Sequence, residues 1–180
     1  SKVVSISTKD RAAIFLAGRN PRHAVYWYSS KDGIFVTSAA YDVASSEGNA
    51  AARVVARFNQ GKAGPDLAAH FGTIWLRMTT PQPVPAGGYD VDLDAYQDPI
   101  VGPLFPHDLS AAKYPYPRAL LWSPIADRLL ADLALDLLDD DELGLGRDDV
   151  PDLLAVSFSA NDYVSHYYGS ESVEELEVLR

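Results

Sequence analysis

Two stretches at opposite ends of the chain place a short apolar run directly before polar residues and a helical pattern. The run "KVVSIS" (Lys2 to Ser7) precedes "TKDRAAIFLAGR", and "DLLAVSFS" precedes "ANDYVSHYYG". Short β-branched runs bounded by hydroxyl residues are typical of buried strands. Strand–helix units build α/β proteins, which bind ligands where their strands end. The sequence therefore predicts an α/β fold with functional polar residues at strand ends.

The intervening sequence predicts both helices and antiparallel strands. In "HAVYWYSSKDGIFVTSAAY", two aromatic and β-branched runs flank a turn sequence and indicate a hairpin. Helices are expected over Lys9–Arg19, over Glu47–Gly61 and from Ser123 to Gly144. A further strand is expected in "GTIWLRM", and a second buried strand is expected at Leu153–Ser159. The order predicts part of a parallel sheet with flanking helices and an inserted antiparallel β patch.

Apolar faces and capping residues mark the two longer helices. In the last helix Ser123 is expected as the N-cap, with Pro124 as the first helical residue. The residues expected to face the core are Val54, Val55 and Phe58 in one helix, and Ile125, Leu129, Leu133 and Leu137 in the other.

Residues 1–180 are expected to form a single partial domain. Residues 80–118 are rich in proline, glycine and aspartate, and they are too long for an ordinary connection, so they predict an ordered insertion or cap. The chain starts in a strand pattern and stops inside the helical "VEELEVLR". We therefore expect a piece of a longer protein, with apolar surface that favours self-association.

Composition excludes several classes of function. The formal net charge of −10 opposes general nucleic-acid binding, although a small anionic substrate could bind at a local cation or metal. The absence of cysteine excludes disulfides, thiolate catalysis and cysteine zinc sites. No apolar run approaches the roughly 18 residues that a membrane span needs.

Asp162 and His166 are the first candidate site residues. A carboxylate and an imidazole are good zinc ligands, and residues four apart on a helix point the same way. Spacing alone leaves a second interpretation open, because an aspartate at a helix start is commonly a cap.

Lys9 and Arg11 are the second candidates, at the end of the first predicted strand and the start of a helix. Two cations there, next to Thr8, suit a phosphate or sulfate oxygen. The alternative is a pair of solvated cations on an exposed turn. The aspartates at 90, 92, 94 and 98 fail the calcium-loop pattern. His23, His70 and His107 lack ligand spacing and are expected to be structural, or at most to form the wall of a cleft.

Taken in order, several motifs resemble a known family. They are "SISTKDRAAIFLAG", "AVYWY", "GIFVTSAAY", "FNQGK", "FPHDL", "SPIADRLLADLALDLL" and "DLLAVSFSANDYVSHYYG". This order resembles the middle part of bacterial alkaline phosphatases of the type I phosphodiesterase/nucleotide pyrophosphatase branch of the alkaline phosphatase superfamily. The "S-x-K-D-R" and "D-Y-V-x-H" elements are the most specific parts of the resemblance.

The resemblance implies a two-zinc phosphomonoesterase of periplasmic or secreted location. It implies that Asp162 and His166 bind one zinc, and that Lys9 and Arg11 hold phosphoryl oxygens of a small phosphate monoester. The family's glycine before the histidine is Ser165 here. The family's nucleophile and its remaining zinc ligands would lie outside this chain. We therefore expect the chain alone to hydrolyse no phosphate ester and to retain no zinc.

Two other functions stay open at this point. One is a non-catalytic module that binds a partner through residues 80–118. The other is a phosphodiesterase or phosphonate hydrolase of the same superfamily, which Lys9 and Arg11 disfavour because a monoester dianion needs more cationic contacts than a diester.

Overall fold

The structure, a computed structural model, describes residues 1–41, 49–78, 101, 105–170 and 172–179. A four-stranded sheet in the order β3–β2–β1–β6 forms its centre. The strands are β1 (Val3–Ser7), β2 (Ala24–Ser29), β3 (Ile34–Val36) and β6 (Leu153–Ser157). Strand β1 runs parallel to both β2 and β6, and β3 is antiparallel to β2. The predicted α/β sheet is confirmed.

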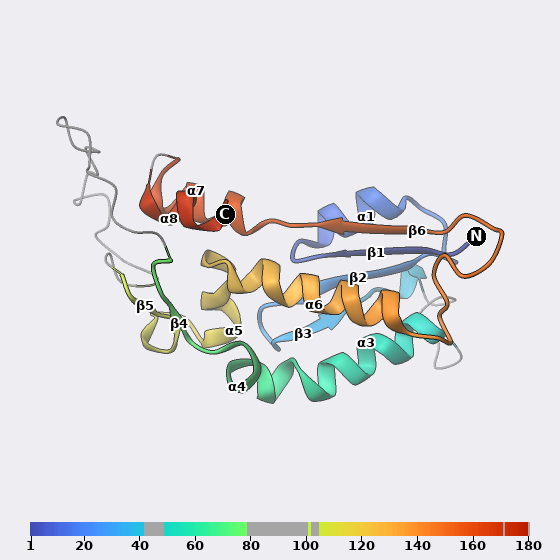
Figure 1. Ribbon diagram of the computed structural model, residues 1–180, viewed down its shortest axis with the longest axis horizontal. Coiled ribbons are helices and arrows are strands. Elements are labelled where there is room, and N and C mark those ends of the chain that lie inside the picture. The colour runs from blue at the N-terminus through green and yellow to red at the C-terminus, as the bar shows by residue number, and fades with distance from the viewer. Residues whose placement is uncertain (42–48, 79–100, 102–104, 171, 180) are drawn as a thin grey trace.

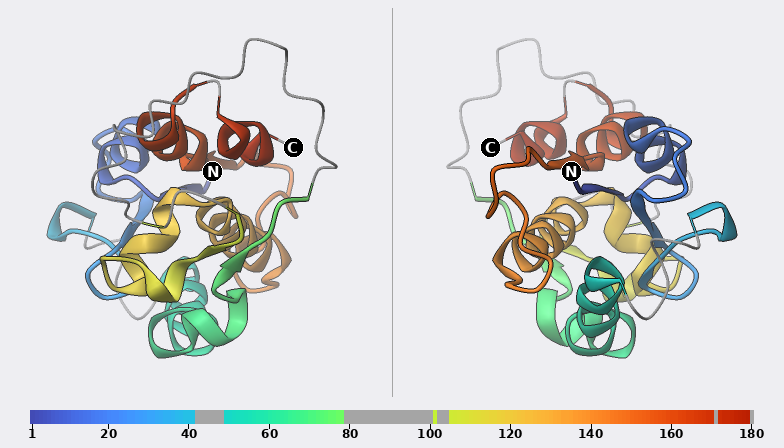
Figure 2. Two further views of the ribbon diagram at one scale, coloured as in Figure 1. Left: turned by 90° about the vertical axis from the view of Figure 1, so that its left-hand side faces the viewer. Right: turned by 90° about the vertical axis from the view of Figure 1, so that its right-hand side faces the viewer.

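Helices cover both faces of this sheet (Figure 1). Helix α1 (Asp10–Ala17) lies on one face, while α3 (Ala50–Gly61) and α6 (Ile125–Asp139) lie on the other (Figures 1 and 2). The alternation of strand side chains explains this division. Val4 and Ile6 belong to the large core with α3 and α6, whereas Val25 packs with Ala13 and Ala17 of α1.

The remaining elements lie mostly past the carboxyl ends of the parallel strands (Figure 1). Helices α7 (Ala160–Tyr168) and α8 (Val173–Val178) pack beside a separate antiparallel sheet of β4 (Ile74–Trp75) and β5 (His107–Asp108). The other short elements are η1 (Ala39–Tyr41), η2 (Gly64–Asp66), α4 (Leu67–Phe71), η4 (Leu109–Ala111), α5 (Tyr116–Ala119) and η5 (Leu120–Trp122).

The apolar stripes predicted for the two long helices are confirmed. Each of the seven side chains expected in the core is at most 8% exposed. Helix α6 begins at Ile125 with Pro124 at the N-cap, so the predicted N-cap at Ser123 and first helical residue at Pro124 are each wrong by one position, although the Ser123 hydroxyl accepts from the Ile125 amide at 3.3 Å. The helices predicted over Lys9–Arg19 and Glu47–Gly61 also form, over the shorter ranges of α1 and α3.

The predicted hairpin is confirmed, because β2 and β3 pair in antiparallel, and it belongs to the main sheet, since β2 also pairs with β1. Two other strand predictions need correction. The strand expected in "GTIWLRM" is only two residues long and pairs with β5 in the separate sheet. Leu153–Ser159 was expected to be fully buried, but β6 ends at Ser157 and is the edge strand of the described sheet, so Leu153 is half exposed.

The insertion predicted over residues 80–118 falls largely outside the described residues, as do the aspartates at 90–98. Its described part includes β5, η4 and α5. No helix in the described part of the chain has the length and apolar character required to cross a membrane.

Candidate functional site

The candidate site lies at the carboxyl ends of β1 and β6. Ser7 is in register with Ser157, so the residues that follow the two strands leave the sheet side by side. Lys9 and Arg11 follow β1 and begin α1, while Asp162 and His166 lie on α7, which follows β6. The parallel pairing therefore joins two motifs that lie about 150 residues apart.

The two predicted pairs are in direct contact. The Lys9 ammonium forms an ion pair with Oδ2 of Asp162. The other oxygen, Oδ1, lies 3.6 Å from Nε2 of His166. Lys9 also lies 4.6 Å from the centre of the Tyr163 ring, in a cation–π arrangement. The carboxylate of Asp162, a candidate metal ligand, thus contacts both Lys9, a candidate phosphate-binding residue, and His166, the second candidate metal ligand.

Asp162 is held in its ionised form. The hydrogen bond from Lys9 has the largest effect and lowers the pKa of Asp162. Desolvation opposes this effect, and the charges of Lys9 and His166 lower the pKa further. Burial raises the pKa of the neighbouring Tyr163, with Asp162 and Asp10 adding to the rise and Arg11 opposing it. The site therefore combines a carboxylate with a neutral phenol near two cations.

Arg11 is exposed, and its guanidinium makes no hydrogen bond or ion pair within the described residues. It lines a cavity of about 590 Å³ together with Thr8, Lys9, Asp162 and His166. Lys31 and other residues at the end of β2 complete the rim. An unpaired guanidinium beside a cavity can bind an anion without first breaking an internal ion pair.

A carboxylate from α6 fixes the start of α7. Oδ1 of Asp127 accepts from the amides of Ser159 at 3.0 Å and Ala160 at 3.1 Å. Burial raises the pKa of Asp127 against the lowering effect of these two bonds. Asp162 therefore does not act as the cap, because its side chain bonds to Lys9 and the capping oxygen comes from Asp127.

Replacing Asp127 with alanine is expected to lower the free energy of unfolding by about 1–3 kcal/mol, since two amides at the start of α7 lose their acceptor. Urea unfolding measures the loss. Asp127→Asn keeps an oxygen acceptor and is the matched control, with a smaller loss. Equal stability of Asp127→Ala and the wild type would contradict the capping role.

The geometry of Asp162 and His166 fits one zinc ion. Two ligands of a tetrahedral zinc with bonds of about 2.0–2.2 Å lie about 3.4 Å apart, close to the observed 3.6 Å. Both side chains are exposed, at 52% and 81%. Within the described residues, however, no group of three or more His, Asp or Glu side chains could hold a metal ion. Within the described residues, the pair alone could therefore supply only two of the three or four protein ligands that a zinc site uses.

Lys9 favours the ionised form of Asp162. Replacing Lys9 with methionine is expected to raise the pKa of Asp162 toward its ordinary value, because the hydrogen bond and nearby charge are lost. Carboxyl-carbon NMR measures this pKa, and Lys31→Met, on the same rim, should leave it unchanged.

The effect on stability has a defined sign. A lowered pKa in the folded state stabilises the fold above the unfolded pKa of about 3.9. The advantage of the wild type over Lys9→Met, below about 1 kcal/mol for such an exposed pair, should vanish as the pH falls through the pKa of Asp162. An advantage that persists in acid would argue against the ion pair.

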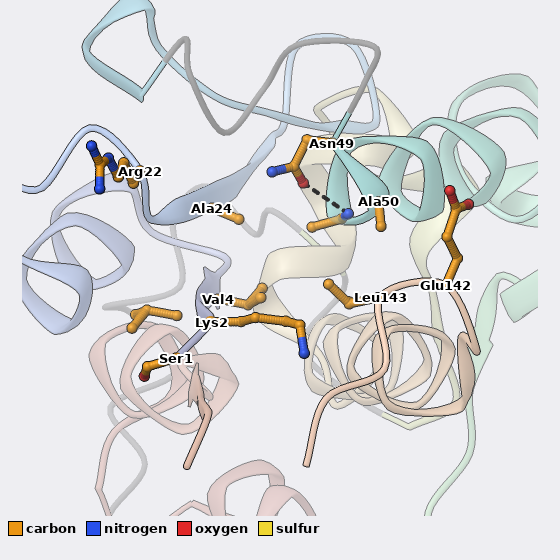
Figure 3. Close-up of a pocket in the computed structure, with 11 residues that line it drawn as sticks. Ser1, Lys2, Val4, Arg22, Ala24, Asn49, Ala50, Glu142 and Leu143 are labelled. Carbon is orange, nitrogen blue, oxygen red and sulfur yellow. Dashed lines mark hydrogen bonds between the residues drawn. The ribbon is translucent and has the colours of Figure 1, made fainter. Parts of the chain in front are cut away.

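A second cavity of about 310 Å³ lies at the amino ends of β1 and β2 (Figure 3). Two of its polar side chains already have partners within the described residues. Asn49 caps α3 by accepting from Ala51 at 2.9 Å, and the Lys2 ammonium pairs with Asp152 at 3.3 Å. The cavity at the carboxyl ends is the better candidate, because it gathers Lys9 and Arg11 with Asp162 and His166.

The other histidines take structural positions, as expected. Nδ1 of His23 contacts the carbonyl of Ala17 at 2.6 Å, His70 contacts Asp132, and buried His107 contacts Glu174 at 3.1 Å. Sequence reasoning did not identify Asp127 or Tyr163 as parts of the site. No local motif marks them, because their roles depend on contacts between separate elements.

Comparison with known proteins gives several relatives. The chain is 30% identical to "Alkaline phosphatase PafA" of Elizabethkingia meningoseptica and 31% identical to "Alkaline phosphatase PhoD" of Zymomonas mobilis, in each case over 97% of this chain. It is also 30% identical, over 97% of its length, to a Myroides odoratus protein named "Calcium-transporting ATPase". The chain spans 30%, 26% and 30% of the lengths of these three relatives, respectively. No family model matches it.

Proposed function

We propose that this chain, which is related to alkaline phosphatases, forms part of the active site of a zinc-dependent phosphomonoesterase. Asp162 and His166 provide two ligands of one zinc ion, and Lys9 and Arg11 bind the phosphoryl group. The contact between Lys9 and Asp162 carries the proposal, because it links the proposed phosphate-binding residues to the proposed zinc ligands in the lining of one cavity. The sequence relationship supports a phosphoester substrate.

The charges of these residues suit a phosphate monoester. A monoester dianion presents three non-bridging oxygens, and Arg11 can donate two parallel hydrogen bonds to two of them. The Lys9 ammonium has three donors, so it can bind a phosphoryl oxygen while it keeps Asp162 oriented. When bound, zinc would activate the attacking oxygen and hold the leaving oxygen.

The state of the site without metal follows from the same contacts. Lys9 neutralises the carboxylate of Asp162, so the acidic chain carries a preformed ligand pair with little local excess charge. Two protein ligands hold zinc weakly, since working sites use three or four. We propose that the 180-residue chain alone is inactive, and that the other ligands and the nucleophile come from residues outside it.

Turnover of p-nitrophenyl phosphate by the complete gene product, with zinc added, tests the proposal. The wild type should be active, and Asp162→Ala or His166→Ala should lose both bound zinc and turnover. His23→Ala, a histidine remote from the cavity lining, is the matched control. A wild type that hydrolyses diesters much faster than monoesters would instead favour a phosphodiesterase. Turnover by the isolated chain would contradict the proposed division of the site.

The relationship also leads us to propose a periplasmic or secreted location. Fractionation of the producing cells tests this, since activity that stays with the cytoplasmic fraction would contradict it.

A further inference from the structure

Thr8 occupies the junction between β1 and α1, beside both proposed phosphate-binding cations. The residue is only 4% exposed, and its Oγ1 atom has less than 1 Å² of accessible surface. That hydroxyl has no hydrogen-bond partner among the residues that the structure describes. The adjacent Ser7 differs, because its hydroxyl donates to the Ser157 carbonyl at 3.1 Å and accepts from the Lys9 amide at 3.0 Å. Thr8 thus carries a buried donor that the fold leaves unused.

An unused buried hydroxyl is unfavourable, because it has lost its bonds to water without replacement. Such a group calls for an explanation. Thr8 lines the same cavity as Lys9 and Arg11. It also lies at the amino end of α1, an eight-residue helix whose dipole favours an anion at that end. A ligand oxygen at this position would supply the missing partner.

We propose that the Thr8 hydroxyl donates a hydrogen bond to an oxygen of the phosphoryl group bound by Lys9 and Arg11. This inference rests on the proposed function and adds a third, uncharged contact to that site. The three residues span only four positions of the chain, so one tight turn presents an ammonium, a guanidinium and a hydroxyl to one tetrahedral anion. The hydroxyl supplies direction, while the two cations supply most of the charge attraction.

Binding of inorganic phosphate to the 180-residue chain tests the contact without any metal. Thr8→Val keeps the shape of the side chain and removes the donor, so the dissociation constant should rise about tenfold. Thr8→Ser keeps the donor and should stay within about threefold of the wild type. Amide NMR titration reports affinity and location together, and shifts should concentrate at residues 8–11.

Thr37 provides the matched control. Its Oγ1 is also buried and lacks a partner within the described part of the chain, but Thr37 does not line the cavity. Thr37→Val should therefore leave phosphate affinity unchanged. Thermal unfolding supplies a check on folding: Thr8→Val should be at least as stable as the wild type without phosphate, because an unsatisfied donor is removed, yet gain less stability when phosphate is added.

The outcomes separate this inference from the proposed function. If Lys9→Met and Arg11→Ala weaken phosphate binding but Thr8→Val does not, the role of Thr8 is wrong and the phosphate site stands. If none of these three changes alters the affinity, phosphate binds elsewhere and both proposals fail. A wild-type chain that shows no phosphate-dependent shifts at residues 8–11 overturns both as well.

Discussion

Replacing Arg11 with alanine is expected to slow the hydrolysis of phosphate monoesters by the complete gene product about 10²–10³-fold, the usual cost of removing one transition-state donor. The guanidinium is exposed beside the cavity and makes no ion pair among the described residues, so its bonding capacity is available to a substrate. A guanidinium can donate two parallel hydrogen bonds, and such bidentate contacts are strongest with negatively charged oxygens such as those of a phosphoryl group. Steady-state kinetics with p-nitrophenyl phosphate measures the effect.

The matched control is Lys31→Ala, which removes another cation from the rim of the same cavity. It should change monoester hydrolysis less than about tenfold, because simple charge attraction at a surface is weak and screened by salt. Diester hydrolysis should suffer less than monoester hydrolysis from Arg11→Ala. Equal losses for the two substrate classes, or equal losses in the Arg11 and Lys31 variants, would contradict a specific phosphoryl contact.

A large effect on stability is expected at Leu133. Leu133→Ala should lower the free energy of unfolding by about 2–5 kcal/mol, the range for a leucine truncated in a packed core. Its side chain is fully buried, in the core cluster that also contains Val4 and Ile6 of β1. Chemical denaturation of the 180-residue chain measures the loss.

Leu135 lies two positions along the same helix and is 55% exposed, so Leu135→Ala is a control with the same chemical change. It should alter stability by less than about 0.5 kcal/mol. The contrast matters for the site because α6 also carries Asp127, which fixes the start of α7. Similar losses in the two variants would mean that α6 does not pack on the sheet as described.

Local pattern predicted most of the scaffold. Alternating and β-branched runs identified β1, the hairpin and the position of β6, because side-chain period is a property of a single segment. The stripe of α6 was predicted for the same reason, and its four core residues are all buried. The sequence also predicted that Asp162 and His166, four apart on one helix, point the same way, and the two side chains do approach each other.

The remaining features depend on contacts between distant segments. No local pattern indicates that β6 is an edge strand of the described sheet, so the exposure of Leu153 was not predicted. The ion pair of Lys9 and Asp162 depends on the parallel pairing of β1 with β6. The cap of α7 comes from Asp127, 33 positions before Ala160, whereas capping patterns in sequence are local.

Anomalous diffraction at the zinc edge from crystals of the complete gene product, grown with zinc, tests the central claim most directly. The account predicts a zinc peak about 2.0–2.2 Å from a carboxylate oxygen of Asp162 and from Nε2 of His166, the two groups that lie 3.6 Å apart here. Zinc bound elsewhere in the protein, with Asp162 still held only by Lys9, would contradict it.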